Sequence, residues 1–138
     1  MPIVFIEAPK GVRVDAKNLM VEKMTAALDE AWHIPDVRIF IREYTPEHVA
    51  QDGRFQSEPV RPVASLHVPL LRSVDTKRKL AEKLQAAFAE AYAGIANTGE
   101  FLVFVNEYPL ENAFSGGRLQ SDNPEIVEGM KQLNGVGV

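Results

Sequence analysis

The chain has 138 residues, no cysteine and a formal net charge of −4, with 25% charged and 46% hydrophobic residues. This length predicts one domain with a substantial core or two very small ones, and the composition is that of an ordinary globular protein. The lack of cysteine excludes disulfides and thiolate metal sites. The negative charge argues against nucleic-acid binding, which needs a basic face.

No apolar run approaches the roughly 18 residues of a membrane span, and the first residues lack the pattern of a signal peptide. We therefore expect a cytoplasmic protein with no membrane partner. The three histidines (His33, His48, His67) are dispersed along the chain, which predicts no metal site.

The first stretch of the chain predicts a buried strand with reactive chemistry at its start. Met1-Pro2 precedes the apolar run Ile3 to Ile6. A methionine before a residue as small as proline is normally trimmed, which would leave a prolyl amine as the first group of the chain. An amine held beside apolar surface is a candidate general base, because desolvation disfavours its charged form. The alternative is that Met-Pro is a common start without a role.

The next segments follow helix and strand periodicities. Apolar residues at helical spacing predict a helix from an N-cap at Asp15 to about Trp32. Val37, Ile39 and Ile41 then share one face of a strand. Residues 45–61 are expected to form a loop or short hairpin.

The pattern then starts again. An offset of 60 pairs Pro2 with Pro62 and Lys17 with Lys77, and after the helix an offset of 64 pairs Tyr44 with Tyr108. The identities along both offsets far exceed the number expected by chance at ordinary residue frequencies. We infer two modules, residues 1–61 and 62–138, within one compact domain.

Each module is a β-α-β unit, which places its two strands parallel through a right-handed crossover. Two units predict an α/β (α+β) fold with a four-stranded sheet and two helices on one face. The strands carry few purely polar faces, so we expect a symmetric oligomer to cover the other face. From Pro124 to about Leu133 the sequence predicts a short helix, followed by a candidate terminal strand over 134–138.

The combined features resemble the tautomerase superfamily, and the 4-oxalocrotonate tautomerase subfamily most. The matching stretches are Pro2-Ile3, Val37-Arg38-Ile39, Ser65-Leu66-His67-Val68 leading to Leu71-Arg72-Ser73, and Phe114-Ser115-Gly116-Gly117. The resemblance covers residues 2 to about 120. Because two units are fused, the chain is most similar to the two-module members, which include cis-3-chloroacrylic acid dehalogenase, malonate semialdehyde decarboxylase and macrophage migration inhibitory factor. This implies a homotrimer with pseudo-sixfold symmetry and no cofactor.

The resemblance also implies roles for individual residues. Pro2 would be the catalytic base, whereas the nitrogen of Pro62 is locked in a peptide bond. Arg72 would hold a substrate carboxylate with its planar guanidinium, and Arg13, its counterpart in the first unit, would face Pro62.

Two further residues complete the expected site. Arg38 matches an arginine that polarises the substrate carbonyl, and it serves either Pro2 or the inactive Pro62 position. Phe114 is the candidate apolar wall.

The chain departs from the dehalogenases at their water-activating glutamate, which aligns with Ser115 and with Gln51. Their helix histidine falls at Leu28, and Asp36 lies about one residue from the aspartate of the decarboxylase. With no carboxylate placed to activate water, we expect keto–enol tautomerisation of a small 2-oxo or 2-hydroxydienoate acid. The alternatives are a decarboxylase or a hydratase/dehalogenase of the same superfamily, and a cytokine-like binding protein with vestigial activity.

Overall fold

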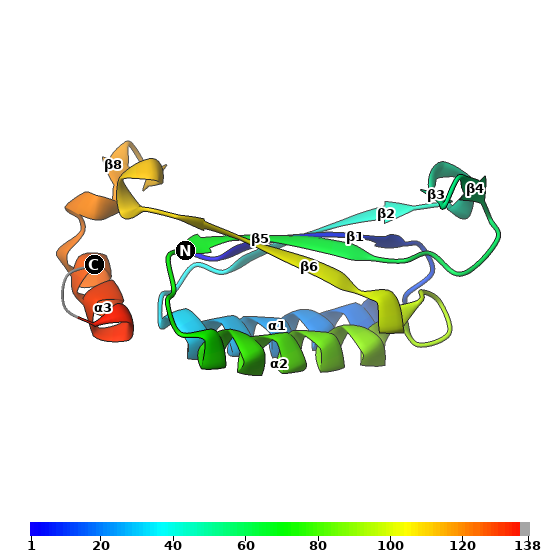
Figure 1. Cartoon of the computed structure of the whole chain (residues 1–138), viewed down its shortest axis with the longest axis horizontal. Coiled ribbons are helices and arrows are strands. Elements are labelled where there is room, and N and C mark those ends of the chain that lie inside the picture. Colours follow the sequence, from blue (N-terminus) through cyan, green and yellow to red (C-terminus); the bar gives the residue numbers. More distant parts are fainter. Residues whose placement is uncertain (136–138) are drawn as a thin grey trace.

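Two β-α-β units form the frame of the computed structural model, which describes residues 1–135 (Figure 1). The elements of these units are β1 (Ile3–Pro9), α1 (Val14–Trp32) and β2 (Arg38–Tyr44), then β5 (Val63–Pro69), α2 (Val74–Tyr92) and β6 (Leu102–Tyr108). The two predicted helices and four predicted main strands are therefore confirmed.

The four strands form one mixed sheet in the order β2-β1-β5-β6. Within each unit the strands are parallel, and the two units join through the antiparallel pair of β1 and β5. Ile3 lies opposite His67 and Glu7 lies opposite Val63. The start of β1 therefore lies at the same end of the sheet as the end of β5, which is the opposite end from Pro62.

Both long helices cover one face of the sheet, below it in Figure 1. Alternate residues of β1, Val4, Ile6 and Ala8, are buried against them, since successive side chains of a strand point to opposite faces. Trp32 and Phe88 fill the same core. Burying side chains of this size contributes about 1.5–3 kcal/mol each before the entropy cost of folding is subtracted.

The other face of the sheet carries large apolar side chains that the single chain leaves exposed. Phe40 is 50% exposed, Leu102 is 51% exposed and Phe104 is 53% exposed. Phe5 stacks on Phe40 with 5.4 Å between ring centroids. This apolar sheet face has no cover within residues 1–135.

The first residue of α1 differs from the prediction. Arg13, in an extended conformation, is the N-cap of α1, and Asp15 lies in the first turn. The expected N-cap at Asp15 was therefore wrong, because the helix begins at Val14 and its N-cap lies two residues earlier than expected. The Asp15 carboxylate still favours this end of the helix through the helix dipole.

Short elements follow each unit at opposite ends of the sheet (Figure 1). The segment expected as a loop or hairpin contains η1 (Pro46–His48), β3 (Ala50–Gln51) and β4 (Arg54–Phe55). After β6 come η3 (Leu110–Asn112), β7 (Phe114–Ser115), β8 (Arg118–Leu119), η4 (Gln120–Asp122) and α3 (Pro124–Asn134). The predicted C-terminal helix is confirmed. The candidate terminal strand falls largely on 136–138, which lie outside the described residues.

Trp32 and Tyr92 occupy equivalent helix positions in the two units but differ in hydrogen bonding. The indole Nε1 of Trp32 donates to the carbonyl of Pro69 at 2.9 Å. The buried hydroxyl of Tyr92 has no hydrogen-bond partner within residues 1–135. Burial, with a smaller contribution from the Glu43 carboxylate, raises the pKa of Tyr92 to about 12.

Replacing Tyr92 with phenylalanine is expected to raise the free energy of unfolding by about 1 kcal/mol, because an unsatisfied buried hydroxyl costs that much or more. Trp32→Phe is the matched control. It leaves the Pro69 carbonyl unpaired and is expected to lower the unfolding free energy by at least about 1 kcal/mol. Urea denaturation of both variants measures the two changes. A loss of stability in Tyr92→Phe equal to that in Trp32→Phe would contradict the expectation.

None of the helices within residues 1–135 combines the length and hydropathy needed to cross a membrane. The same residues contain no cluster of three or more histidine, aspartate or glutamate side chains arranged to hold a metal ion.

Candidate active site

A cavity of about 340 Å³ opens at the start of β1. The first strand, the turn before β2, the end of β6 and the segment after β6 all contribute to its lining. The lining residues are Met1, Ile3, Asp36, Arg38, His67, Tyr108, Asn112, Ala113, Phe114, Ser115 and Gln120. We call this cavity the β1 pocket.

The amino terminus lies in the β1 pocket in a partly desolvated position. Met1 lines the pocket and Pro2 is fully buried behind it. Burial lowers the pKa of the Met1 amine from 8.0 to about 6, against a smaller opposing effect of the Asp36 carboxylate, which favours the charged form. Burial in this position therefore favours the neutral form of the Met1 amine.

Arg38 and Asp36 form the charged side of the β1 pocket. The backbone N–H of Arg38 donates to the Pro2 carbonyl at 3.1 Å, so the first residue of β2 is fixed beside the chain start. The Arg38 guanidinium donates two hydrogen bonds to Asp36, through Nε and Nη2, both at 3.0 Å. These bonds lower the pKa of the Asp36 carboxyl, which is ionised at neutral pH.

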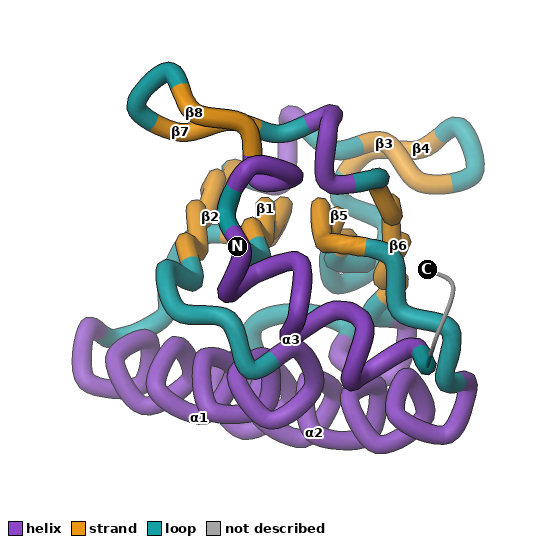
Figure 2. Tube along the Cα trace, turned by 90° about the vertical axis from the view of Figure 1, so that its left-hand side faces the viewer, coloured by secondary structure: helices purple, strands orange, loops and turns teal. Residues whose placement is uncertain are grey.

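The second unit supplies the opposite wall. In Figure 2 the β7–β8 hairpin, which follows β6 in the chain, lies above β2 and β1. It brings Phe114 and Ser115 to the same pocket as Arg38. Beneath the hairpin, the hydroxyl of Tyr108 donates to Oε1 of the buried Gln120 at 3.0 Å.

Two of the predicted partners of Pro2 lie in the β1 pocket and two do not. Arg38 and Phe114 line it. Arg72 lies at the same end of the sheet but lines a neighbouring cavity. Arg13 lies beyond the other end of β1 and pairs with Asp15 at 3.1 Å.

Several pocket residues were not predicted from the sequence, among them Tyr108 and Gln120. Asp36, which the sequence placed about one residue from the aspartate of the decarboxylase, also lines the pocket. Asp36 adopts a left-handed backbone conformation with φ of 71°, which turns the chain between Ile34 and β2. The repeat pairs Tyr44 with Tyr108 and Gln56 with Gln120, and this was the only signal for those two positions.

The equivalent end of the second unit has a peptide bond where the first unit has the chain start. Pro62 is buried, and Arg61 precedes it as Met1 precedes Pro2. The Arg61 guanidinium pairs with Glu58 at 2.7 Å and with Asp52 at 2.7 Å. Its backbone N–H donates to Gln51. Because the Pro62 nitrogen is an amide, this end offers no base.

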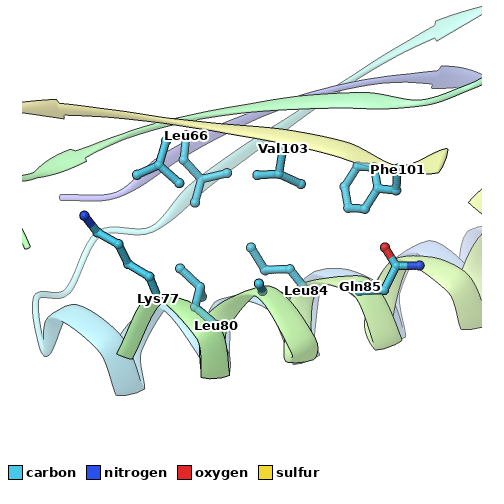
Figure 3. Close-up of a pocket in the computed structure, with 9 residues that line it drawn as sticks. Leu66, Lys77, Leu80, Leu84, Gln85, Phe101 and Val103 are labelled. Atoms are coloured by element: carbon cyan, nitrogen blue, oxygen red, sulfur yellow. The ribbon is translucent and has the colours of Figure 1, made fainter. Parts of the chain in front are cut away.

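A third cavity, between α2 and β6, is shown in Figure 3. Leucine, valine and phenylalanine side chains form most of its walls. Its two long polar side chains are already engaged, since Lys77 pairs with Glu107 at 2.9 Å and Gln85 donates to the Thr98 carbonyl at 2.8 Å. The polar ends of both side chains are therefore already hydrogen-bonded within the protein.

The opposing effects of burial and Asp36 lead to a prediction about the amine. In a chain that retains Met1, the amine is expected to titrate near pH 6. Asp36→Asn is expected to lower that pKa further, because it removes the nearby negative charge that favours the ammonium form. NMR titration of the terminal amine measures both values. A pKa near 8 in the unchanged chain, or a rise in Asp36→Asn, would contradict this account.

No protein-family model and no curated protein sequence matches the chain. Solved structures do match it. A native fused 4-OT has a TM-score of 0.74 and 21% identity over 86% of this chain and 96% of that one. A fused 4-OT solved as an asymmetric trimer has a TM-score of 0.71 and 21% identity, with the same coverage. A malonate semialdehyde decarboxylase (FG41) inhibited by 3-bromopropiolate has a TM-score of 0.61 and 17% identity over 84% of this chain and 91% of that one.

The chain therefore has the fold of the tautomerase superfamily, with two β-α-β units and a mixed four-stranded sheet.

Proposed function

We propose that the chain is a cofactor-independent keto–enol tautomerase that acts on a small 2-oxo or 2-hydroxydienoate acid, with Pro2 as general base once Met1 is removed. The observation that carries the proposal is the setting of the amine. The Met1 amine lies at a buried strand start, where desolvation outweighs the charge of Asp36 and lowers the pKa of that amine to about 6. Once Met1 is removed, the Pro2 nitrogen becomes the terminal amine of the same buried strand start, where burial acts in the same direction. A base with a pKa near the working pH transfers protons efficiently.

In the proposed reaction, the neutral Pro2 amine removes a proton from the enol or from the carbon next to the carbonyl. It then returns the proton to another position of the conjugated system. Arg38 binds the substrate carboxylate or carbonyl oxygen and stabilises the enolate charge. Phe114 covers the apolar part of the substrate. Arg72 and Arg13, which were expected near a proline, line no part of the β1 pocket and take no role in this proposal.

We also propose a homotrimer. The exposed side chains of Phe40, Leu102 and Phe104 support it, since an apolar sheet face of this kind is normally covered. A matched fused 4-OT is itself a trimer. Light scattering of the purified protein tests the mass of the assembly.

The test of the activity compares two forms of the same chain. Protein whose intact mass shows that Met1 is absent is expected to ketonise 2-hydroxymuconate or phenylenolpyruvate, and a form that keeps Met1 is expected not to. Equal rates for the two forms would rule out the prolyl amine as the base. No turnover of any enol by the processed form would favour a binding protein with this fold.

Decarboxylation is the second candidate, and Asp36 is the observation that favours it. Its carboxylate lies in the pocket beside the amine and opposes the fall in the pKa of that amine. An ammonium form would polarise a carbonyl and would not remove a proton. Release of CO₂ from malonate semialdehyde that is faster than any ketonisation, and that is lost in Asp36→Asn, would select this candidate.

A further inference from the structure

Asn134, the last residue of α3, is the only one of the six asparagines in the chain that precedes a glycine. An asparagine before glycine is open to attack by the next backbone nitrogen, because glycine has no Cβ to hinder the approach. The Gly135 nitrogen bonds to Cγ of Asn134 and the side-chain amide leaves as ammonia, which gives a cyclic succinimide. Water then opens the ring at one of its two carbonyls, and the product is aspartate or isoaspartate.

In the structure the side chain of Asn134 joins α3 to the β5–α2 loop. Its Oδ1 accepts a hydrogen bond from the Arg72 backbone N–H at 2.7 Å, and its Nδ2 donates to the Leu70 carbonyl at 2.8 Å. Within residues 1–135, no other side chain of α3 hydrogen-bonds to this loop. The remaining attachment of α3 is apolar and centres on Met130, which is 3% exposed. The Asn134 amide is therefore the polar clasp of this helix.

The docked position of Asn134 opposes the reaction. The two hydrogen bonds fix its side chain on the loop, whereas attack requires Cγ to swing toward the Gly135 nitrogen. The side chain must first leave Arg72 and Leu70, and the last turn of α3 must open. Helix ends fray, and such local opening costs less free energy than unfolding of the whole domain. The reaction therefore proceeds from the opened end of α3, at a rate that follows the population of this open form.

The product cannot rebuild the clasp. An ionised aspartate at position 134 has no N–H group to donate, so two acceptors would face each other at the Leu70 carbonyl. Its negative charge also lies at the C-terminal end of α3, where the helix dipole disfavours an anion. Isoaspartate adds a methylene to the main chain and displaces the carboxylate from the loop. Either product keeps the end of α3 open.

We propose that Asn134-Gly135 is a deamidation site that releases α3 from the β5–α2 loop irreversibly. Release uncovers Met130 and opens the cavity of about 460 Å³ that Met130 and Val127 line. One additional carboxylate changes the formal net charge of the chain from −4 to −5. Within residues 1–135, no residue of α3 lines the β1 pocket, so this inference does not rest on the chemistry proposed for Pro2.

Ageing of the full chain in warm, mildly alkaline buffer, followed by tryptic peptide mapping, measures the reaction. Asn134 is expected to deamidate roughly tenfold or more faster in the urea-unfolded chain than in the folded chain, because unfolding removes the two hydrogen bonds. Asn123, at the other end of α3, is the matched control. It precedes Pro124, whose nitrogen carries no hydrogen and cannot form the ring, so Asn123 is expected to keep its amide. Equal rates at Asn134 in the folded and unfolded chains, or no product at Asn134 in either, overturn the proposal.

Asn134→Asp reproduces one product and tests the release. Amide hydrogen exchange in α3 and trypsin cleavage after Lys131 are both expected to become roughly tenfold faster or more. Asn123→Asp is the control, because aspartate caps a helix N-terminus as well as asparagine does. Its exchange and cleavage rates are expected to match those of the unchanged chain. Unchanged rates in Asn134→Asp, or an equal acceleration in Asn123→Asp, overturn the proposal.

Discussion

Extending the chain by one residue before Pro2 is expected to lower kcat for ketonisation by about 10²–10⁴, the usual contribution of a positioned general base. The extension converts the prolyl amine into an amide with no basic lone pair. Pro2→Ala keeps an amine at the same position, so its kcat is expected to fall less than that of the extended chain. Steady-state kinetics with 2-hydroxymuconate measure both, once intact mass has established which first residue each sample carries.

Pro62→Ala provides the matched control for these variants. Pro62 is the same residue at the equivalent strand start, but its nitrogen is already an amide, formed with Arg61. We expect its kcat to match that of the unchanged chain, with any effect confined to stability. Full activity in the extended chain, or an equal loss in Pro62→Ala, would show that the Pro2 amine is not the base.

Replacing Arg38 with alanine is expected to lower kcat/KM by about 10², because the variant loses the guanidinium that we propose stabilises the enolate. The loss is expected in both kcat and KM if the guanidinium binds the carboxylate as well as the transition state. Arg38→Lys is expected to recover only part of the activity, since an ammonium cannot reproduce the planar fork.

Arg42→Ala is the control for Arg38→Ala. Arg42 lies four residues further along β2 on the same face, pairs with Glu7 at 2.6 Å and does not line the β1 pocket. Its activity is expected to be close to that of the unchanged chain. Normal turnover in Arg38→Ala together with loss of turnover in Arg72→Ala would transfer the anchoring role to Arg72.

The Arg38→Ala variant is also expected to change the pH profile of the activity. Without Arg38, the carboxylate of Asp36 loses its two hydrogen bonds and its neutralising partner. The full negative charge then acts on the amine, which favours the ammonium form and raises the pKa of the amine. The pH at which activity reaches half of its maximum is therefore expected to rise in Arg38→Ala.

The fold was predicted in detail because its signals are local. Helical spacing in the two long helices and the alternation of apolar residues along the strands depend only on neighbouring positions. The repeat then showed that both units form the same structure. Arg38 and Phe114 were also predicted as site residues, on the strength of the family resemblance.

The grouping of side chains at the site could not be predicted to the same degree. Asp36 reaches the β1 pocket through a left-handed turn that no pattern in the sequence marks. Tyr108, at the end of β6, and Gln120, directly after β8, reach it because the antiparallel pairing of β1 with β5 brings the end of the second unit to the start of the first. Arg72 was expected beside Pro2, but the side chain lines the cavity that α3 closes.

The sequence by itself determined the two units, their helices and strands, and the difference between Pro2 and Pro62, since each depends on residue type and spacing along one segment. Only the tertiary structure decided which groups share a cavity. The antiparallel pairing of β1 with β5 places the start of one unit against the end of the other. Residues about seventy to one hundred and twenty positions apart thereby line one pocket. The desolvation that lowers the pKa of the terminal amine also arises only from that packing.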